Sequence, residues 1–244
     1  MTCVRSRFRF LSLLVTLAVA AACGRAPASS ATANGGAEAN APVLDAAQQA
    51  EAQRTVILFL GDSLTAGLGL TLAQAYPNRV LELFANEGYD QVDVQNAGVS
   101  GDTTAGGLRR VESLLAPNVK IVVVALGGND ALRGLSVTQT RANLEAIVDL
   151  LLQHGRAVLL AGMEAPTNLG GDYQQAFHDA FVGLLQAHRG GITFMPFLLE
   201  GVAGDPSLNQ ADGIHPHDAG ARIIAQHMYP LLRDMVDQLP VVGG

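Results

Sequence analysis

From residue 55 onward, short apolar runs alternate with segments that have the spacing of amphipathic helices. The runs that predict strands lie at 55–60 (TVILFL), 92–95, 119–126 (VKIVVVAL), 157–161 (AVLLA) and 192–195. Runs that are apolar throughout are typical of parallel strands buried on both faces, whereas half-exposed strands alternate. The pattern therefore predicts an α/β fold with three layers, α/β/α, around a five-stranded parallel sheet.

The segments between these runs predict the helices that cover the sheet. The predicted helices lie at 77–86, from Asp102 or Thr103 onward, and at 138–154, 173–188 and 217–239. Pro230 falls inside the last of them and predicts a kink or a break there. Ligands of such folds bind at the carboxyl ends of the strands, so the loops that follow the strands are the places to look for a site.

The composition supports a large buried core and argues against binding to nucleic acid. Hydrophobic residues make up 49% of the 244 residues, and charged residues only 15%. The formal net charge is -7, and Lys120 is the only lysine. Because the neutralisation of phosphates requires a basic face, we expect no nucleic-acid partner.

The amino-terminal segment has the features of an export signal. Arginines precede an apolar run at 10–22 that is too short to span a bilayer, and Cys23 directly follows a row of alanines. This arrangement resembles the lipobox of bacterial lipoproteins, although Ala20 stands where such boxes usually have leucine. We therefore expect residues 1–22 to be a lipoprotein-type signal peptide and Cys23 to carry the lipid. The alternative is an ordinary secretory signal that is cleaved nearby.

Residues 23–54 are dominated by small and polar residues, which predicts a flexible tether, and the folded domain is expected at 55–240. The protein is then expected to be exported and held by its lipid on a bacterial membrane, facing the periplasm. Without the lipid it would be soluble in the periplasm or secreted.

Ser63 follows the first predicted strand in the run Gly-Asp-Ser-Leu. A serine at this position alone is more often the cap of a helix, because a hydroxyl needs a base to become a nucleophile. The candidate base is His215, with Asp212 three residues before it as the carboxylate that would orient it. Asp212 and His215 could equally form a surface turn, and His217 raises the further alternative of a metal site with His215.

Two other strand ends offer hydrogen-bond donors for the negative charge that develops on a carbonyl oxygen during ester hydrolysis. The second strand is followed by Gly-Val-Ser-Gly-Asp at 98–102, and the third by Gly-Gly-Asn-Asp at 127–130. The first segment provides unhindered backbone amides, and the second provides a carboxamide. Each segment taken singly is also ordinary turn chemistry.

These four segments, in this order, resemble the blocks of the SGNH (GDSL) hydrolases: 61–64, 96–102, 127–130 and 212–216. The run Gly-Gly-Asn-Asp-Ala-Leu-Arg-Gly at 127–134 is similar to the subgroup of multifunctional acyl-CoA thioesterases, lysophospholipases and arylesterases. The resemblance implies a flavodoxin-like fold that needs no cofactor and no metal. It also implies that Ser63 is the nucleophile, His215 its base and Asp212 the orienting carboxylate. The implied oxyanion hole consists of the Ser63 amide, the Gly101 amide and the Asn129 side chain.

In this subgroup the segment after the asparagine borders the acyl pocket, which implies substrate contacts from Leu132, Arg133, Gly134 and Leu135. The lipobox-like leader and the tether are departures from the subgroup. The expected function is a serine esterase that hydrolyses acyl esters or thioesters, including lysophospholipids, through an acyl-enzyme. An acyltransferase on the same fold is the alternative, an inert binding protein is a third possibility, and no protein partner is implied.

Overall fold

The computed structural model describes residues 54–240. The predicted signal peptide, Cys23 and all but the last residue of the predicted tether lie outside the described residues. The described part contains five parallel strands, in the order β2-β1-β3-β4-β5. They are β1 (Thr55–Gly61), β2 (Val92–Gly98), β3 (Val119–Ala125), β4 (Ala157–Ala161) and β5 (Thr193–Met195). The predicted five-stranded parallel sheet is confirmed.

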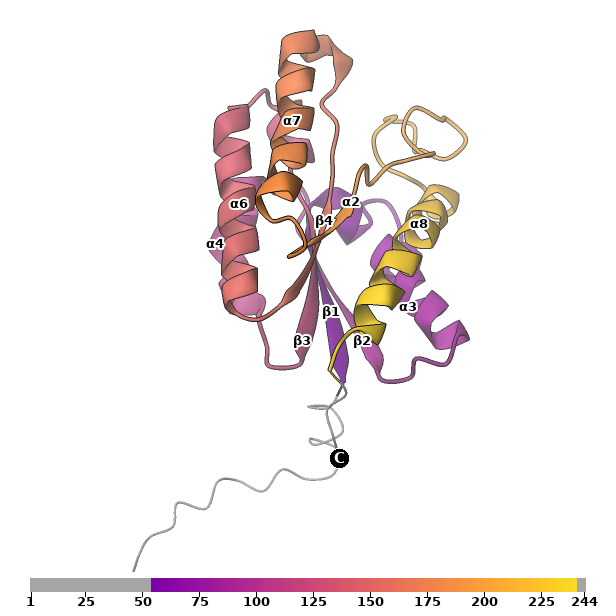
Figure 1. Ribbon diagram of the computed structural model, residues 1–244. Helices are drawn as coiled ribbons and strands as arrows, with labels where there is room; N and C mark the ends of the chain where they lie inside the picture. The colour runs from indigo at the N-terminus through magenta and orange to yellow at the C-terminus, as the bar shows by residue number, and fades with distance from the viewer. Residues whose placement is uncertain (1–53, 241–244) are drawn as a thin grey trace, which may run out of the picture. The chain divides into compact units, whose positions relative to one another are not determined.

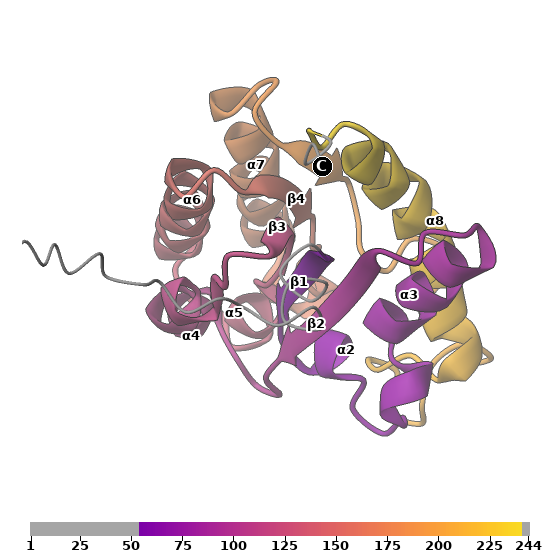
Figure 2. The ribbon, with the colours of Figure 1, turned by 90° about the horizontal axis from the view of Figure 1, so that it is seen from below.

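Helices cover both faces of this sheet. The α-helices are α2 (Ser63–Ala66), α3 (Tyr76–Asn86), α4 (Thr104–Arg110), α5 (Gly128–Leu132), α6 (Val137–Gln153), α7 (Gly171–Ala187) and α8 (Asp218–Asp237). Helices α3 and α8 pack together on one face, and α4, α6 and α7 pack in sequence on the other, as Figures 1 and 2 show. The three-layer arrangement expected from the sequence is therefore present.

The core lies between the sheet and these two helical layers. The central strands β1 and β3 are buried along almost their whole length, and Phe59, Val122 and Val123 are fully enclosed. Helix α3 contributes Val80 and Phe84 to one side of the sheet. Burial on both faces explains why β1 and β3 lack the polar alternation of a half-exposed strand.

The predicted element boundaries differ from the structure at a few places. Strand β2 continues to Gly98, three residues beyond the prediction, because it stays in register with β1 as far as the Gly61–Gly98 pair. Helix α8 runs without interruption through Pro230, so the chain does not break there. None of the helices formed by residues 54–240 has the length and apolar character needed to cross a membrane.

Candidate active site

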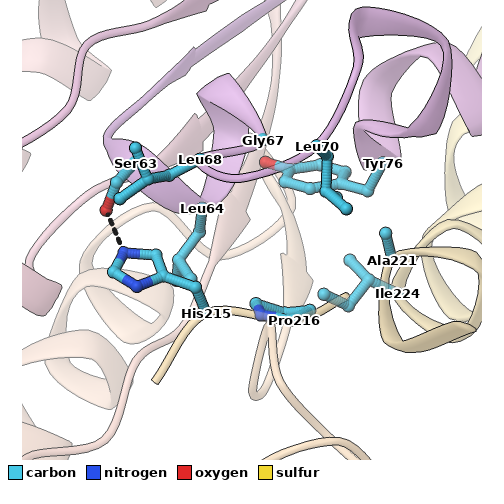
Figure 3. Close-up of a pocket in the computed structure, with 10 residues that line it drawn as sticks. All are labelled: Ser63, Leu64, Gly67, Leu68, Leu70, Tyr76, His215, Pro216, Ala221 and Ile224. Carbon is cyan, nitrogen blue, oxygen red and sulfur yellow. Dashed lines mark hydrogen bonds between the residues drawn. The ribbon is translucent and has the colours of Figure 1, made fainter. Parts of the chain in front are cut away.

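Ser63 is the first residue of α2 and lies directly after the carboxyl end of β1. The cap of this short helix is Asp62, whose Oδ1 accepts a hydrogen bond of 3.0 Å from the Leu64 amide. The simpler interpretation of Ser63 as a helix cap is therefore wrong, and its hydroxyl is free for another partner. Ser63 Oγ lies 2.8 Å from His215 Nε2. Figure 3 draws this contact as a dashed line between the two side chains.

His215 is oriented by Asp212 within one tight turn. The Asp212 Oδ2 atom lies 2.7 Å from His215 Nδ1, and Asp212 Oδ1 accepts hydrogen bonds from the Ile214 and His215 amides at 2.9 and 3.0 Å. These amides, that of His215 above all, together with the imidazole, lower the pKa of Asp212 to about 2. An ionised carboxylate only accepts, so Nδ1 carries the imidazole proton and Nε2 can accept the proton of Ser63.

The loop that carries His215 is attached to the segment after Ser63 by Gln210. Its amide donates to the His215 carbonyl at 2.7 Å, and its side-chain Nε2 donates to the Leu68 carbonyl at 2.7 Å. Gly69 is needed at this contact, because a Cβ there would lie 2.3 Å from Gln210 Oε1. Gln210 thus links the two loops that bring the serine and the histidine together.

The backbone amides expected as oxyanion donors differ in whether they already donate to another group of the protein. The Gly98 amide already donates to Asn96 Oδ1 at 3.0 Å. Within residues 54–240, neither the Ser63 amide nor the Gly101 amide donates a hydrogen bond to another protein group. The loop takes a positive φ of 80° at Gly101, a conformation that favours glycine. The two amides that the resemblance implies thus have no acceptor among the described residues, and the Ser100 amide in the same loop has none either.

Asn129 lies in the first turn of α5, next to the buried carboxyl group of Asp62. Its Nδ2 donates to Asp62 Oδ2 at 3.1 Å, which leaves the second hydrogen of the carboxamide unused by this contact. Asp62 is 3% exposed, and burial raises its pKa to about 6, although the hydrogen bonds from Leu64 and Asn129 oppose the rise. The sequence did not single out Asp62 as a functional residue, although it stands within the first block.

A largely apolar cleft opens beside the serine and the histidine. Its volume is about 610 Å³. Besides Ser63, His215 and Asn129, its walls include apolar side chains from several loops: Leu132, Met163, Pro166, Phe197, Leu199 and Ile214. A cleft of this size and character suits a small apolar ligand that is gripped by a few polar groups.

Of the four residues expected to contact the substrate, Leu132 alone is in the lining of this cleft. The Arg133 guanidinium donates to the Gly101 carbonyl at 2.8 Å, and the Leu135 carbonyl accepts from the Tyr173 hydroxyl at 2.8 Å. Sequence reasoning missed Met163 and Phe197, which follow β4 and β5. The rule that ligands sit at strand ends could have pointed to them.

The alternative interpretation of His215 and His217 as metal ligands has no support among residues 54–240. His217 caps α8, where its Nδ1 accepts from the Ala219 amide at 3.2 Å. Among residues 54–240, no group of three or more His, Cys, Asp and Glu side chains is arranged to hold a metal ion.

Residues 59–223 match the GDSL-like Lipase/Acylhydrolase family. The chain belongs to this family. It is 40% identical over 190 residues to Esterase TesA of Pseudomonas aeruginosa, with 78% of this chain and 92% of that protein covered. It is 35% identical over 182 residues to Thioesterase 1/protease 1/lysophospholipase L1 of Escherichia coli, with 74% and 85% covered.

Solved structures of GDSL hydrolases have the same fold. The crystal structure of TesA superimposes with a TM-score of 0.70 at 38% identity and covers 74% of this chain and 99% of its own. The psychrotrophic esterase EstA from Pseudoalteromonas, inhibited by monoethylphosphonate, superimposes with a TM-score of 0.69 at 29% identity, with 75% and 100% covered. The resemblance drawn from the four blocks is confirmed, and this protein is a GDSL esterase that acts on small-molecule esters.

Proposed function

We propose that this esterase works through a Ser63–His215–Asp212 triad and an acyl-enzyme. The observation that carries the proposal is the continuous chain of contacts, 2.8 Å from Ser63 Oγ to His215 Nε2 and 2.7 Å from His215 Nδ1 to Asp212 Oδ2. A nucleophile, a base and a group that orients the base are thus held within hydrogen-bonding distance.

In the first step the Ser63 oxygen bonds to the carbonyl carbon of the ester as its proton passes to His215 Nε2. The carbonyl oxygen becomes an oxyanion between the Ser63 amide, the Gly101 amide and the Asn129 carboxamide. The tetrahedral intermediate collapses, and the leaving alcohol or thiol takes the proton from Nε2. Water, deprotonated by the same imidazole, then attacks the acyl-enzyme and releases the carboxylic acid.

We propose that the apolar cleft holds the acyl chain of the substrate, with Leu132 on its rim. Ser63 and His215 line this cleft together with Met163 and Phe197, so an acyl group attached to Ser63 would have apolar side chains beside it. Acyl esters, acyl thioesters and lysophospholipids all present such a chain. The relatives named above are an esterase and a thioesterase/lysophospholipase, and neither name describes an acyltransferase.

Activity of Ser63→Ala with p-nitrophenyl acyl esters is the direct test. We expect turnover and labelling by a fluorophosphonate to be lost together, because both require the Ser63 oxygen. Ser136→Ala is the matched control, since Ser136 is exposed at the start of α6, where its hydroxyl accepts from the Gln139 amide at 3.4 Å, and it is not in the lining of the cleft. Full activity of Ser63→Ala would refute the proposed triad.

The predicted leader and the lipid on Cys23 lie outside the described residues and stay a prediction. We propose that the protein is exported and that Cys23 holds it to a membrane. In cells, Cys23→Ala should move the protein from the membrane fraction to the soluble fraction without changing its specific activity. Unchanged membrane association would contradict the role of Cys23.

A further inference from the structure

Arg110, the last residue of α4, bridges the ends of two neighbouring strands. Its Nη2 donates to the Gly61 carbonyl at 3.0 Å, its Nη1 to the Ala97 carbonyl at 2.8 Å, and its Nε to Asp102 Oδ2 at 2.8 Å. The side chain is 22% exposed. A planar guanidinium presents several donors in a fixed geometry, so it can hold three acceptors at set positions where an ammonium cannot.

The three acceptors lie at or just beyond the carboxyl ends of β1 and β2, the strands that lead to the Ser63 and Gly101 amides. Gly61 ends β1 and is two residues before Ser63, whereas Asp102 directly follows Gly101. Asp102 is itself held by the Thr103 amide, which donates to its Oδ1 at 3.1 Å, and its carboxyl group fills the space that Gly106 leaves open, where a Cβ would lie 1.6 Å from Oδ1. The Asp102 carboxyl group therefore connects the Arg110 guanidinium to the backbone next to Gly101.

Two further hydrogen bonds hold the peptide that joins Gly101 to Asp102. Arg133 donates to the Gly101 carbonyl at 2.8 Å, and the Asp102 amide donates to the Val99 carbonyl at 3.0 Å. The loop from Val99 to Asp102 is thus tied to the third strand end by Arg133 and to the first by Arg110. The Gly61 carbonyl, in the backbone that leads into Ser63, accepts from Arg110 and also from the Val99 amide at 3.0 Å. Arg110 is the side chain that connects this carbonyl to Asp102, beside Gly101.

We propose that Arg110 is a positioning residue of the oxyanion hole, which sets the separation between the Ser63 and Gly101 amides. This inference rests on the proposed function, because it assumes that both amides bind the oxyanion. Two donors stabilise the transition state only when both lie at hydrogen-bonding distance from the same oxygen. Loss of the guanidinium should therefore slow the chemical step more than it weakens the binding of substrate.

The experiment compares Arg110→Met and Arg110→Lys with Arg54→Met. Arg54 is a matched control, because it contacts the Asp90 carbonyl at 3.4 Å and Asp93 at 3.7 Å, at the opposite ends of the same two strands. We expect kcat for a short p-nitrophenyl ester to fall about 10- to 100-fold in Arg110→Met, less than for deletion of a donor. Arg110→Lys should fall in between, KM should change little in each variant, and Arg54→Met should keep its kcat.

A second measurement separates positioning from a general loss of stability. A trifluoromethyl ketone accepts the Ser63 oxygen at its carbonyl carbon and places a negatively charged oxygen in the hole, whereas the matching methyl ketone largely stays a neutral carbonyl. The inhibition constant of the trifluoromethyl ketone should rise in Arg110→Met in parallel with the loss of kcat. That of the methyl ketone should stay nearly constant.

If Arg110→Met does not fold, Asp102→Asn and Arg110→Lys can replace it, because both preserve the shape of the site better. Each should show a smaller loss of kcat and of trifluoromethyl ketone affinity, with KM nearly constant. The inference is overturned if the Arg110 variants lose melting temperature but keep kcat and trifluoromethyl ketone affinity, while Ser63→Ala is inactive. An active Ser63→Ala would instead overturn the proposed function.

Discussion

The buried carboxyl group of Asp62 predicts how the stability of the protein depends on pH. This group is 3% exposed and lies between α2 and Asn129. Burial raises its pKa from the ordinary value of 3.8 to about 6. Each tenfold change in proton affinity is equivalent to about 1.4 kcal/mol, so the ionised carboxyl lowers the free energy of unfolding by about 3 kcal/mol.

The sign of the pH dependence follows from which state holds the proton more tightly. Below about pH 4 the group is protonated in both the folded and the unfolded chain, and it imposes no penalty. As the pH rises, the unfolded chain loses this proton first, so the stability falls until the folded state has also ionised, just above pH 6. In Asp62→Asn this contribution is absent at every pH.

The assay is urea unfolding, followed by circular dichroism, of wild type and Asp62→Asn between pH 4 and 7.5 at constant ionic strength. Asp62→Asn should gain up to about 3 kcal/mol relative to wild type over this range. Its weakened contact with Asn129 costs about 1 kcal/mol at every pH, which shifts the difference but not its slope. Asp90→Asn is the control, because it makes the same substitution at an exposed residue in the turn before β2. A difference between wild type and Asp62→Asn that does not change with pH would refute this reasoning.

Three further predictions concern the oxyanion hole, the catalytic triad and the apolar cleft. Asn129→Ala should lower kcat about 100- to 1,000-fold with little change in KM, as expected for one oxyanion donor, and steady-state kinetics with p-nitrophenyl butyrate would check this. Asp212→Asn should lower kcat by up to about 10,000-fold, because the amide favours the wrong imidazole tautomer; an equal loss of activity in Asp205→Asn, outside the triad, would count against this reason. Ala203→Phe narrows the cleft, so it should raise KM for long-chain esters about tenfold and leave the acetate ester unaffected. Equal effects on both chain lengths would show that the acyl chain lies elsewhere.

The fold was predictable because its signals are local. The run 119–126 is apolar except for Lys120, a pattern typical of a strand covered on both faces, and the structure buries β3 accordingly. Strand length was harder to predict: β2 extends to Gly98 through its pairing with β1, which no residue of β2 specifies by itself. Pro230 is a similar case, since α8 packs on α3 and continues through the proline.

The four sequence blocks by themselves determined the family and the candidate site residues. Each block is a short run of consecutive residues, so its residue types can be recognised without knowledge of the fold. Only the tertiary structure brought Ser63 to His215, which lies 152 residues further on. It alone revealed Asp62 as a buried acid, Arg110 as a bridge between two strand ends, and Met163 and Phe197 as walls of the cleft. Burial and bridging depend on neighbours from distant segments, and no local pattern records which segments those will be.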